Sequence, residues 1–492
     1  MRVMAALGLL AVAFVALSLS HCGSSPAPPG DAGADLAPND MARMTCAVSS
    51  TCPVASPICG TDKICRTCAG PSDDSECGMR FLTPRCDAVS GQCVACRPDT
   101  QAVDCTDPAS PACGSDGTCR PCLAQGECGS AQICNSISGR CVGAADIAYV
   151  DNRGMTVAAC KAAGGTQDGN APGTAFCDIA DGVASFKPNV LVAGSAQPYS
   201  AFALSDPRAV NVVGPGKSAS TPAIVVATSG VVVSVTAGRL TVDGLVLGDG
   251  TTATTATGVS CNGARADVRD TKIQKMGARG IDSTSCDLVV DRSLVTGSTG
   301  AGLVTSQGTL QLTRSTVTAN GAGGIAIGLN TTFIVQNTFI TGNTGVSDPG
   351  VRIDATASGD FAFNSVVGNT RSADAGGIDC GGVGLQKPIY ASIVWGNSTL
   401  SLGGGKATQF GGNQCLLSQV VTGTDSYLGA TQLSPSFSTD PHLVVGDPAN
   451  LACCVDKITP PDGGSSTLPN VDIDGDRRPK GAGWEIGADE VQ

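Results

Sequence analysis

Apolar, mostly β-branched residues recur at a fixed step in the middle of the chain. Six-residue blocks begin at Val268, Val290 and Leu312, so each block follows the last after 22 residues (290 − 268 and 312 − 290). A fixed period in this range indicates one short unit stacked on copies of itself. β-branched residues punctuated by Gly favour strands over helices. The pattern therefore predicts an all-β parallel solenoid with one unit per coil. Pairs of Gly and an apolar residue keep the same step at 258–259, 280–281, 302–303 and 324–325.

The six-residue block recurs with looser spacing on either side of the strict repeat, at Val242–Leu247, Val335–Ile340, Ala362–Val367 and Ile389–Val394. Stacked coils place equal positions about 4.8 Å apart, so polar residues at one position can form a hydrogen-bonded ladder. We predict a hydroxyl ladder at the fourth position of the block, which holds Leu245, Thr271, Ser293, Ser315, Thr338, Ser365 and Ser392. Asn tolerates the left-handed conformation of a corner, which predicts a second ladder at Asn320, Asn343, Asn369 and Asn397.

The first coil of a solenoid needs a cap, because an uncovered end strand presents unpaired backbone groups. The segment Phe176–Ala184 is amphipathic and is predicted to be a short capping helix. Cys160 and Cys177 are predicted to pin the Gly-rich loop between them. We place the solenoid domain at residues 146–492.

Cysteines mark a different kind of region before the solenoid. Sixteen of the 25 Cys fall between Cys46 and Cys141, in four groups of four. Units this small cannot bury a sufficient apolar core, so cross-links must stabilise them. We predict a disulfide-rich module at residues 46–142, in which each group allows three connectivities. The groups are Cys46, Cys52, Cys59, Cys65; Cys68, Cys77, Cys86, Cys93; Cys96, Cys105, Cys113, Cys119; and Cys122, Cys128, Cys134, Cys141.

Three Cys-x-x-Cys pairs in the module, at 65/68, 93/96 and 119/122, have a spacing that also suits zinc. Disulfides are preferred, because the module has no His and so many Cys indicate an oxidising compartment. After the module, Cys261 with Cys286 and Cys380 with Cys415 are interpreted as disulfides between neighbouring coils. The adjacent Cys453 and Cys454 are expected to have distant partners rather than each other.

The first 45 residues carry targeting features. Residues 1–21 hold one Arg and then an apolar run too short for a stable membrane span, which predicts an export signal. Residues 22–45 are rich in Pro, Ala, Gly and Asp and are predicted to be a flexible linker. The formal charge of −12 and the pI near 4.6 argue against nucleic acid as a partner.

The export segment ends Leu19-Ser20-His21-Cys22, which resembles the bacterial lipobox, although that family has Gly, Ala or Ser where His21 stands. The resemblance implies a lipid on Cys22 that anchors the chain to a membrane, at the outer membrane or cell surface. Simple secretion is the alternative. The cysteine groups resemble the short, loosely EGF-like repeats of exported bacterial lipoproteins.

The repeated blocks, the Gly-Ile pairs and the Asn positions resemble the right-handed parallel β-helix of the pectate-lyase-like superfamily, over residues 149–492. The ending, Asp472–Gly481 with Trp484–Glu490, is similar to the terminal motif of bacterial surface β-helix proteins. This similarity implies an exported, surface-attached protein.

Polysaccharide lyases of this superfamily imply Asp-bound calcium with an Arg or Lys base, and the related hydrolases pair Asp with His. The chain has only two His, His21 and His442. Asp270, Arg292 and Arg314 share one turn position and form the best cluster for a uronate carboxylate. The alternative is a surface ladder that balances charge.

Two further acidic sets are candidates for a cation. Asp472, Asp474 and Asp476 alternate as in a calcium loop, against the alternative of a structural turn that closes the last coil. No other cofactor is expected. The second set is Asp354, Asp360, Asp374 and Asp379, beside the loop 370–377.

The sequence thus predicts a surface-exposed lipoprotein that presents a parallel β-helix as an extracellular binding or structural module, with carbohydrate as the candidate ligand. A polysaccharide lyase or glycoside hydrolase on the same fold is the alternative, because fold alone does not establish an activity.

Overall fold

The structure is a computed structural model of the 492-residue chain. It describes residues 45–422 except 80–82, 115, 130–131, 251–254, 373, 383, 385, 400–408 and 413. Beyond these it describes residues 430–432, 435–437, 442–444, 446–458, 469, 471–476, 478–479 and 483–489. The export signal, Cys22 and most of the linker lie outside the described residues.

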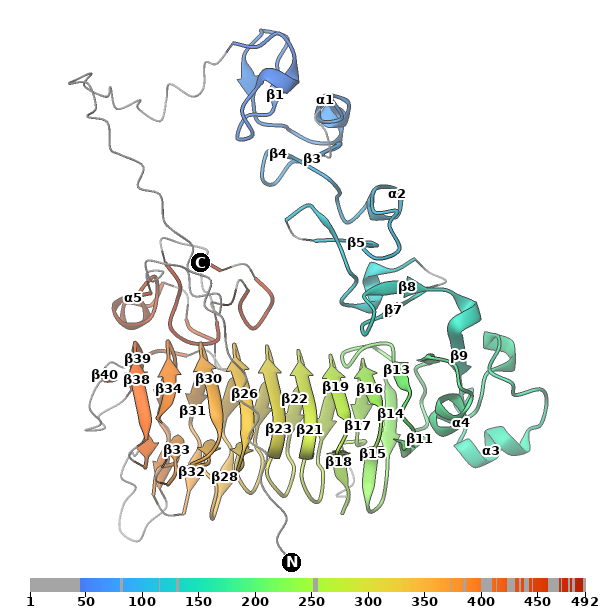
Figure 1. The fold of residues 1–492 in the computed structure, drawn as a ribbon, viewed down its shortest axis with the longest axis vertical. Coiled ribbons are helices and arrows are strands. Elements are labelled where there is room, and N and C mark those ends of the chain that lie inside the picture. The colour runs from blue at the N-terminus through green and yellow to red at the C-terminus, as the bar shows by residue number, and fades with distance from the viewer. Residues whose placement is uncertain are drawn as a thin grey trace, which may run out of the picture. The chain divides into compact units, whose positions relative to one another are not determined.

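Parallel strands stacked coil upon coil form most of the chain after Val142 (Figure 1). Each full coil contributes to three faces. The first face contains β12 (Phe202–Leu204), β15 (Val231–Val235), β18 (Thr257–Asn262), β25 (Ile325–Ile327), β29 (Val351–Ile353), β33 (Ile378–Cys380), β37 (Phe410–Gly411) and the first halves of β21 (Ile281–Asp291) and β23 (Leu303–Thr313).

The second face contains the second halves of β21 and β23 and the strands on either side of them. These are β9 (Ile147–Val150), β10 (Asn189–Val192), β13 (Ala209–Val213), β16 (Arg239–Asp243), β19 (Arg265–Arg269), β26 (Thr331–Gln336), β30 (Ser358–Ala362), β34 (Lys387–Tyr390) and β38 (Cys415–Ser418).

The third face is a separate parallel sheet. It contains β11 (Tyr199–Ser200), β14 (Ala223–Val226), β17 (Leu245–Leu247), β20 (Lys272–Gln274), β22 (Leu294–Thr296), β24 (Thr316–Thr318), β27 (Phe339–Thr341), β31 (Ser365–Val367), β35 (Ile393–Trp395), β39 (Val420–Thr422) and β40 (Ala430–Gln432). Three short strands pair beside it: β28 (Thr344–Gly345), β32 (Thr370–Arg371) and β36 (Ser398–Thr399).

The strand register follows the 22-residue step. Val268 pairs with Val290 and Val290 with Leu312 on the second face. Val, Ile and Leu at these positions point inward and are fully buried, as the repeat requires. The prediction of a β-solenoid preceded by a disulfide-rich module is confirmed.

The hydroxyl ladder is present inside the turn between the second and third faces. Ser293 Oγ accepts the Thr271 N–H at 3.2 Å and donates to the Asp291 carbonyl at 2.9 Å. The position assigned to Ser365 was wrong by one residue. Thr338 N–H donates to Asn364 Oδ1 at 3.1 Å, so Asn364 is the ladder residue, and the block there spans 361–366.

The Asn ladder is present, but for a different reason from the predicted one. Each buried side-chain amide donates to the next at 2.9 Å, from Asn320 through Asn343 and Asn369 to Asn397. None of the four has a positive φ. The left-handed position is the residue before each Asn, with φ between 56° and 66° at Ala319, Gly342, Gly368 and Gly396.

Helices cover the first coil. α4 (Ile179–Ala184) lies within the predicted capping segment and buries Ile179 and Val183 against β9, β10 and β12. Gly182 is required there, because a Cβ would lie 2.7 Å from Val150. A disulfide between Cys160 and Cys177 joins α3 (Val157–Ala162) to the start of the cap, beyond the turn η6 (Pro172–Thr174).

Each cysteine group has the same pairing, first with third and second with fourth. The bonds are Cys46–Cys59, Cys52–Cys65, Cys68–Cys86, Cys77–Cys93, Cys96–Cys113, Cys105–Cys119, Cys122–Cys134 and Cys128–Cys141. Each repeat holds an antiparallel hairpin, formed by β1 (Ile58–Cys59) and β2 (Cys65–Arg66), β3 (Arg85–Asp87) and β4 (Gln92–Val94), β5 (Ala112–Cys113) and β6 (Cys119–Arg120), and β7 (Ile133–Asn135) and β8 (Arg140–Val142).

Short helical turns complete the module: η2 (Ser49–Thr51), η3 (Pro71–Asp73), α1 (Asp74–Cys77), α2 (Gln101–Asp104), η4 (Gln125–Glu127) and η5 (Ala144–Asp146). The chain divides into two compact units, the first ending at Val94 and the second beginning at Ala95. The second unit therefore contains the third and fourth repeats together with the β-helix, whereas the sequence placed the boundary after Val142.

The C-terminal segment folds back onto the third face. Buried Arg478 donates to the carbonyls of Glu485 and Gly487, and the Ala488 N–H donates to Ser365 Oγ at 3.2 Å. Apolar residues of this segment, which includes α5 (Pro448–Cys453), pack with Ile393 and Val421. The expectation of distant partners for Cys453 and Cys454 was wrong, since they bond to each other. The other Cys of the β-helix are already paired, as Cys160–Cys177, Cys261–Cys286 and Cys380–Cys415.

None of the helices in the described part of the chain has the length and apolar character that a membrane crossing requires.

Candidate functional sites

The corner between the second and third faces brings together the predicted lyase candidates. Asp270, Arg292 and Arg314 follow directly after the paired residues Arg269, Asp291 and Thr313, so they occupy one position on successive coils. All three have left-handed backbones, with φ of 41°, 49° and 46°. We call Asp270, Arg292, Arg314 and their ionic neighbours the charged corner.

Ion pairs within the charged corner do not follow the predicted stack. Asp270 pairs with Lys217 at 3.2 Å rather than with the two Arg residues. Both Arg residues instead contact Asp291, Arg314 at 2.6 Å and Arg292 at 3.3 Å. Arg314 forms a two-pronged contact, since its Nε also donates to Asp291 at 2.9 Å. The two guanidinium groups are thus engaged with a carboxylate of the protein itself.

Asp243 is a member of the charged corner that the sequence did not single out. It is stacked with Arg269 and Asp291 and is 4% exposed. Burial raises the pKa of its carboxyl from 3.8 to about 6, and the nearby Asp270 and Asp291 add to the rise, against the opposing effect of Arg292 and Arg269. Its Oδ2 has no hydrogen-bond partner among the described residues. Asp243 is the second residue of the block that starts at Val242. This position in the repeat is the sequence feature from which it could have been predicted.

The fourth cysteine repeat is fixed to the β-helix by buried polar contacts. Asn135 Nδ2 donates to Asn189 Oδ1 at 2.6 Å, and Asn211 Nδ2 donates to the Cys134 carbonyl at 3.1 Å. All three Asn side chains are buried. From the charged corner, Arg292 donates to the carbonyl of Leu123 at 3.1 Å. The repeat therefore lies on the outer side of the second face, where an apolar cluster with Ile133, Ile147, Tyr149, Leu191 and Val213 fills the contact.

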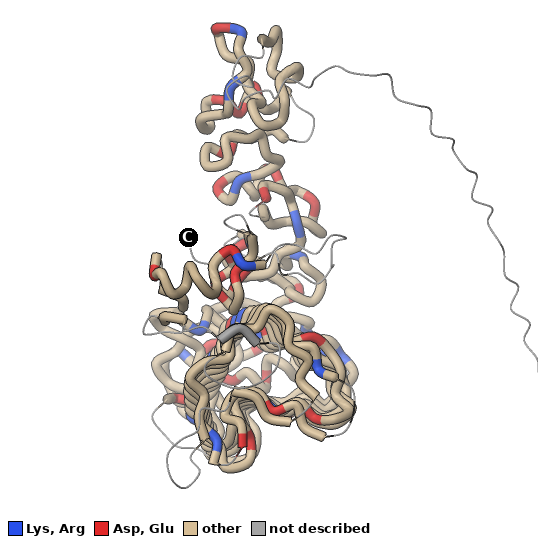
Figure 2. Tube along the Cα trace, turned by 90° about the vertical axis from the view of Figure 1, so that its left-hand side faces the viewer, with Lys and Arg blue, Asp and Glu red and all other residues tan. Residues whose placement is uncertain are grey.

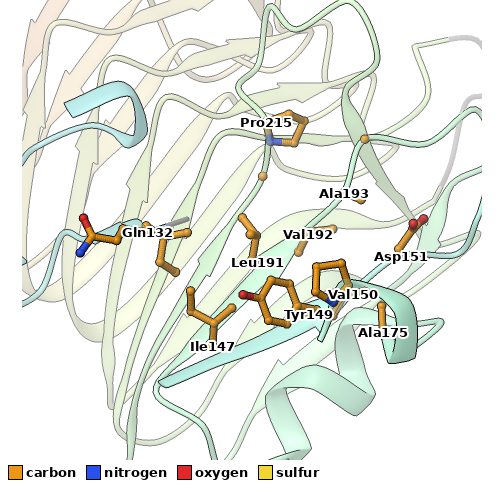
Figure 3. Close-up of a pocket in the computed structure, with 14 residues that line it drawn as sticks. Gln132, Ile147, Tyr149, Val150, Asp151, Ala175, Leu191, Val192, Ala193 and Pro215 are labelled. Atoms are coloured by element: carbon orange, nitrogen blue, oxygen red, sulfur yellow. The ribbon is translucent and has the colours of Figure 1, made fainter. Parts of the chain in front are cut away.

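A hollow of about 520 Å³ opens beside this contact (Figure 3). Strands β9 and β10 supply Tyr149 and Leu191, Asp151 follows directly after β9, and the fourth repeat supplies Gln132. The lining is mainly apolar, with one aromatic ring and a few hydrogen-bonding groups. We call it the junction pocket. No local sequence pattern predicts it, because separate segments of the chain form its walls, with Gln132 and Ile133 on one side and Ile147, Tyr149 and Leu191 on the other.

The acidic residues of the later coils do not converge on one point. Arg352 pairs with Asp348 at 2.8 Å and contacts Asp354 at 3.7 Å. One coil on, Arg371 pairs with Asp379 at 2.9 Å, while Asp374 lies 4.0 Å away. Asp360 is exposed on β30. Acidic and basic residues are likewise interspersed around the coil stack seen end on (Figure 2).

The three aspartates predicted for calcium lie in one turn but have different surroundings. Asp472 is fully buried, which raises its pKa, and its Oδ1 accepts the N–H groups of Asp474 and Asp476 at 3.0 and 2.8 Å. This carboxylate thus forms the turn that was the alternative prediction. Asp474 points instead to His442 at 3.6 Å. The Cys-x-x-Cys thiols are all used in disulfides, so they offer no zinc site.

Comparison with known proteins agrees with the fold. A family model described as "Right handed beta helix region" matches residues 257–415. No curated protein matches. Among solved structures, ORF18 of Geobacillus virus E2 is similar at 10% identity and a TM-score of 0.34, over 56% of this chain and 60% of that one. The chain thus spans less than two thirds of the viral protein.

The pectate lyase Pel9A is similar at 12% identity and a TM-score of 0.28, over 70% of this chain and 96% of that one. Scores this low carry no argument about activity. Together with the observed coils, the family match identifies the solenoid as a right-handed parallel β-helix.

Proposed function

We propose that the chain is an exported, lipid-anchored surface protein whose disulfide-rich module holds a β-helix that binds extracellular polysaccharide. The observation that carries this proposal is the fixed contact between the fourth cysteine repeat and the β-helix, with the junction pocket beside it. A module fixed in this way presents a binding surface in a constant orientation, which lowers the entropic cost of binding.

The disulfides support the exported location. All 24 Cys after Cys22 lie in the twelve disulfides. Such cross-links persist in oxidising compartments and are rare where thiols are kept reduced. Cys22 is then the one Cys left for a lipid, at the position that the lipobox-like sequence assigns to it. Its acyl chains would anchor the module to the membrane.

The junction pocket supports a carbohydrate ligand. Sugar rings bind through an aromatic face combined with a few hydrogen-bonding groups, and Tyr149, Asp151 and Gln132 supply that combination. Gln132 is exposed, so its amide is accessible to a ligand from solvent.

Affinity electrophoresis of the exported chain against acidic and neutral polysaccharides tests this function. We expect at least one polysaccharide to retard the wild type, and Tyr149→Ala to abolish the retardation. Phe186→Ala is the matched control, because Phe186 is an exposed aromatic residue outside the pocket. Tyr149 also packs in the apolar cluster, so Gln132→Ala serves as a second pocket variant, and thermal melting checks that each variant folds. Failure of the whole panel to retard the wild type, or unchanged retardation of both pocket variants, would reject polysaccharide binding at the pocket.

A second candidate function is hydrolysis or elimination of a polysaccharide at the charged corner. Asp243, with its raised pKa, has the character of a general acid, while Asp291 pairs with Arg314 at 2.6 Å and supplies the second carboxyl group. Burial of Asp243 places this function second, because a substrate would first have to reach it. Release of reducing ends, or of unsaturated product with calcium present, by the wild type but not by Asp243→Asn would establish it.

A further inference from the structure

Three segments of the C-terminal region bring one imidazole and two carboxylates together. His442 Nδ1 lies 3.4 Å from Asp489 Oδ1 and 3.6 Å from Asp474 Oδ2. One ligand atom from each residue lies within 4.8 Å of the other two. The three residues are 15 or more positions apart in the sequence, so the fold alone assembles them.

The two distances from His442 Nδ1 to the carboxylates match the separation of neighbouring ligand atoms around a metal ion. An N–H···O hydrogen bond is usually 2.7–3.2 Å long, which is shorter than either contact. In a tetrahedral zinc site, metal–ligand bonds of about 2.0–2.2 Å place neighbouring N and O ligand atoms about 3.4 Å apart. One ion can therefore touch all three groups with little movement of the chain.

Neighbouring groups already orient the ligands. The side chain of Asp489 is only 8% exposed, and its Oδ2 accepts the Leu443 N–H at 3.1 Å, which aims Oδ1 at the imidazole. The ring of His442 packs edge-on against Phe339, with centroids 4.8 Å apart. Outer contacts of this kind fix ligand geometry in metal sites. Asp474 is more exposed and completes the open side.

We propose that His442, Asp474 and Asp489 bind a divalent transition-metal ion of the zinc class, with water in the fourth position. An imidazole ligand favours such ions over calcium, which takes six to eight oxygen ligands. The ion cross-links the C-terminal segment to itself where that segment packs on Phe339 of the third face. It stabilises the closing end of the β-helix in addition to the disulfides.

Cobalt and zinc titrations of the chelator-treated exported chain test this site. We expect one equivalent of Co²⁺ to give the intense visible absorption of a tetrahedral complex, Zn²⁺ to displace it, and Zn²⁺ to raise the melting temperature. Loss of an outer-shell partner alone weakens metal binding by roughly 10–100-fold. Asp474→Asn removes a ligand, so it should weaken zinc binding by at least about tenfold, and His442→Ala should abolish it.

Asp476→Asn is the matched control, because it makes the same charge change in the same exposed loop and should leave the affinity unchanged. Asp474 is 57% exposed, so its replacement tests the site even if His442→Ala fails to fold. Absence of stoichiometric binding to the wild type, or equal affinity of Asp474→Asn and Asp476→Asn, would overturn the proposal.

Discussion

Charged side chains at the corner of the β-helix form ion pairs with oppositely charged neighbours on adjacent coils. Asp243 is an exception, because one of its carboxylate oxygens lacks a hydrogen bond in the described part of the chain. Asp267, on strand β19 of the adjoining second face, shows the satisfied case, since it is fully buried between Arg239 at 2.6 Å and Arg265 at 3.3 Å. Asp243 is equally enclosed but keeps one oxygen without a hydrogen bond among the described residues. An ionised carboxylate in that state is costly, so its protonation is favoured.

Asp243→Asn should therefore remove a pH dependence of stability. The pKa of Asp243 is about 6 in the folded chain and near 3.8 when unfolded, so the folded state holds the proton more tightly. The free energy of unfolding is highest below pH ~4 and falls as the pH rises to about 6. Above pH 6 the variant should exceed the wild type by roughly 1–3 kcal/mol in chemical denaturation. Asp282→Asn is the control, because Asp282 is partly exposed and its carboxylate pairs with Arg279 at 2.7 Å. Identical pH profiles of wild type and Asp243→Asn would disprove the expectation.

Asn343→Ala should destabilise the β-helix strongly. Asn343 accepts from Asn320 and donates to Asn369 and to the Val317 carbonyl, all at 2.9 Å and all buried. Its removal leaves several buried polar groups unpaired, at a cost of about 2–4 kcal/mol. Thr332→Ala, on an exposed position of β26, should change the denaturation midpoint little. Equal effects of the two substitutions would show that the Asn ladder does not stabilise the β-helix more than an exposed side chain does.

Within the strict 22-residue repeat, residue spacing alone was enough to predict which positions stack. It could not predict which of two adjacent polar residues turns inward, as Asn364 and Ser365 demonstrate. The side chains of Asn364 and Ser365 can each form the hydrogen bonds of the ladder. The length of the preceding loop alone determines which of them pairs with Thr338. For the Asn ladder, the spacing was right but the reason was wrong, because the side-chain amides rather than the backbone angles explain the residue type.

At the scale of elements, the contact between the fourth cysteine repeat and the second face is the feature that the sequence did not reveal. Asn135 lies in a hairpin and Asn211 in a coil strand, and neither stands out from ordinary turn and strand polar residues. The hydrogen bonds that join the hairpin to the coil strands depend on the path of the chain between Val142 and Asn189. Local patterns carry no information about such a contact.

Asn211→Ala should loosen the fourth repeat without unfolding the coils. The substitution removes the buried hydrogen bond from Asn211 to the Cys134 carbonyl, which keeps only its bond from Gln125 Nε2 at 3.0 Å. Hydrogen exchange of peptides covering residues 132–142 should accelerate, while those covering the 22-residue coils keep their protection. Asn330→Ala, in an exposed turn, should change neither region. Unchanged exchange at residues 132–142 would mean that the repeat does not depend on this contact.

At the scale of the whole molecule, fold and function were not equally predictable. The repeated apolar pattern predicts a solenoid, and cysteines in groups of four predict disulfides. Both features of the fold could therefore be predicted from the sequence. The junction pocket and the His442 cluster are formed by residues from separate segments of the chain. No sequence motif predicts the pocket or the cluster. The predicted catalytic candidates Asp270, Arg292 and Arg314 do share a corner, but their charges are matched by Lys217 and Asp291.

The proposed surface location and the cross-linked state are tested together by the intact mass of the protein extracted from the membranes of its host without reductant. We expect a chain that begins at Cys22, carries the added mass of acyl groups and lacks 24 hydrogens, two for each of the twelve disulfides. A chain with an unmodified terminus at another residue, or with free thiols throughout the module, would contradict an exported, lipid-anchored and disulfide-cross-linked protein.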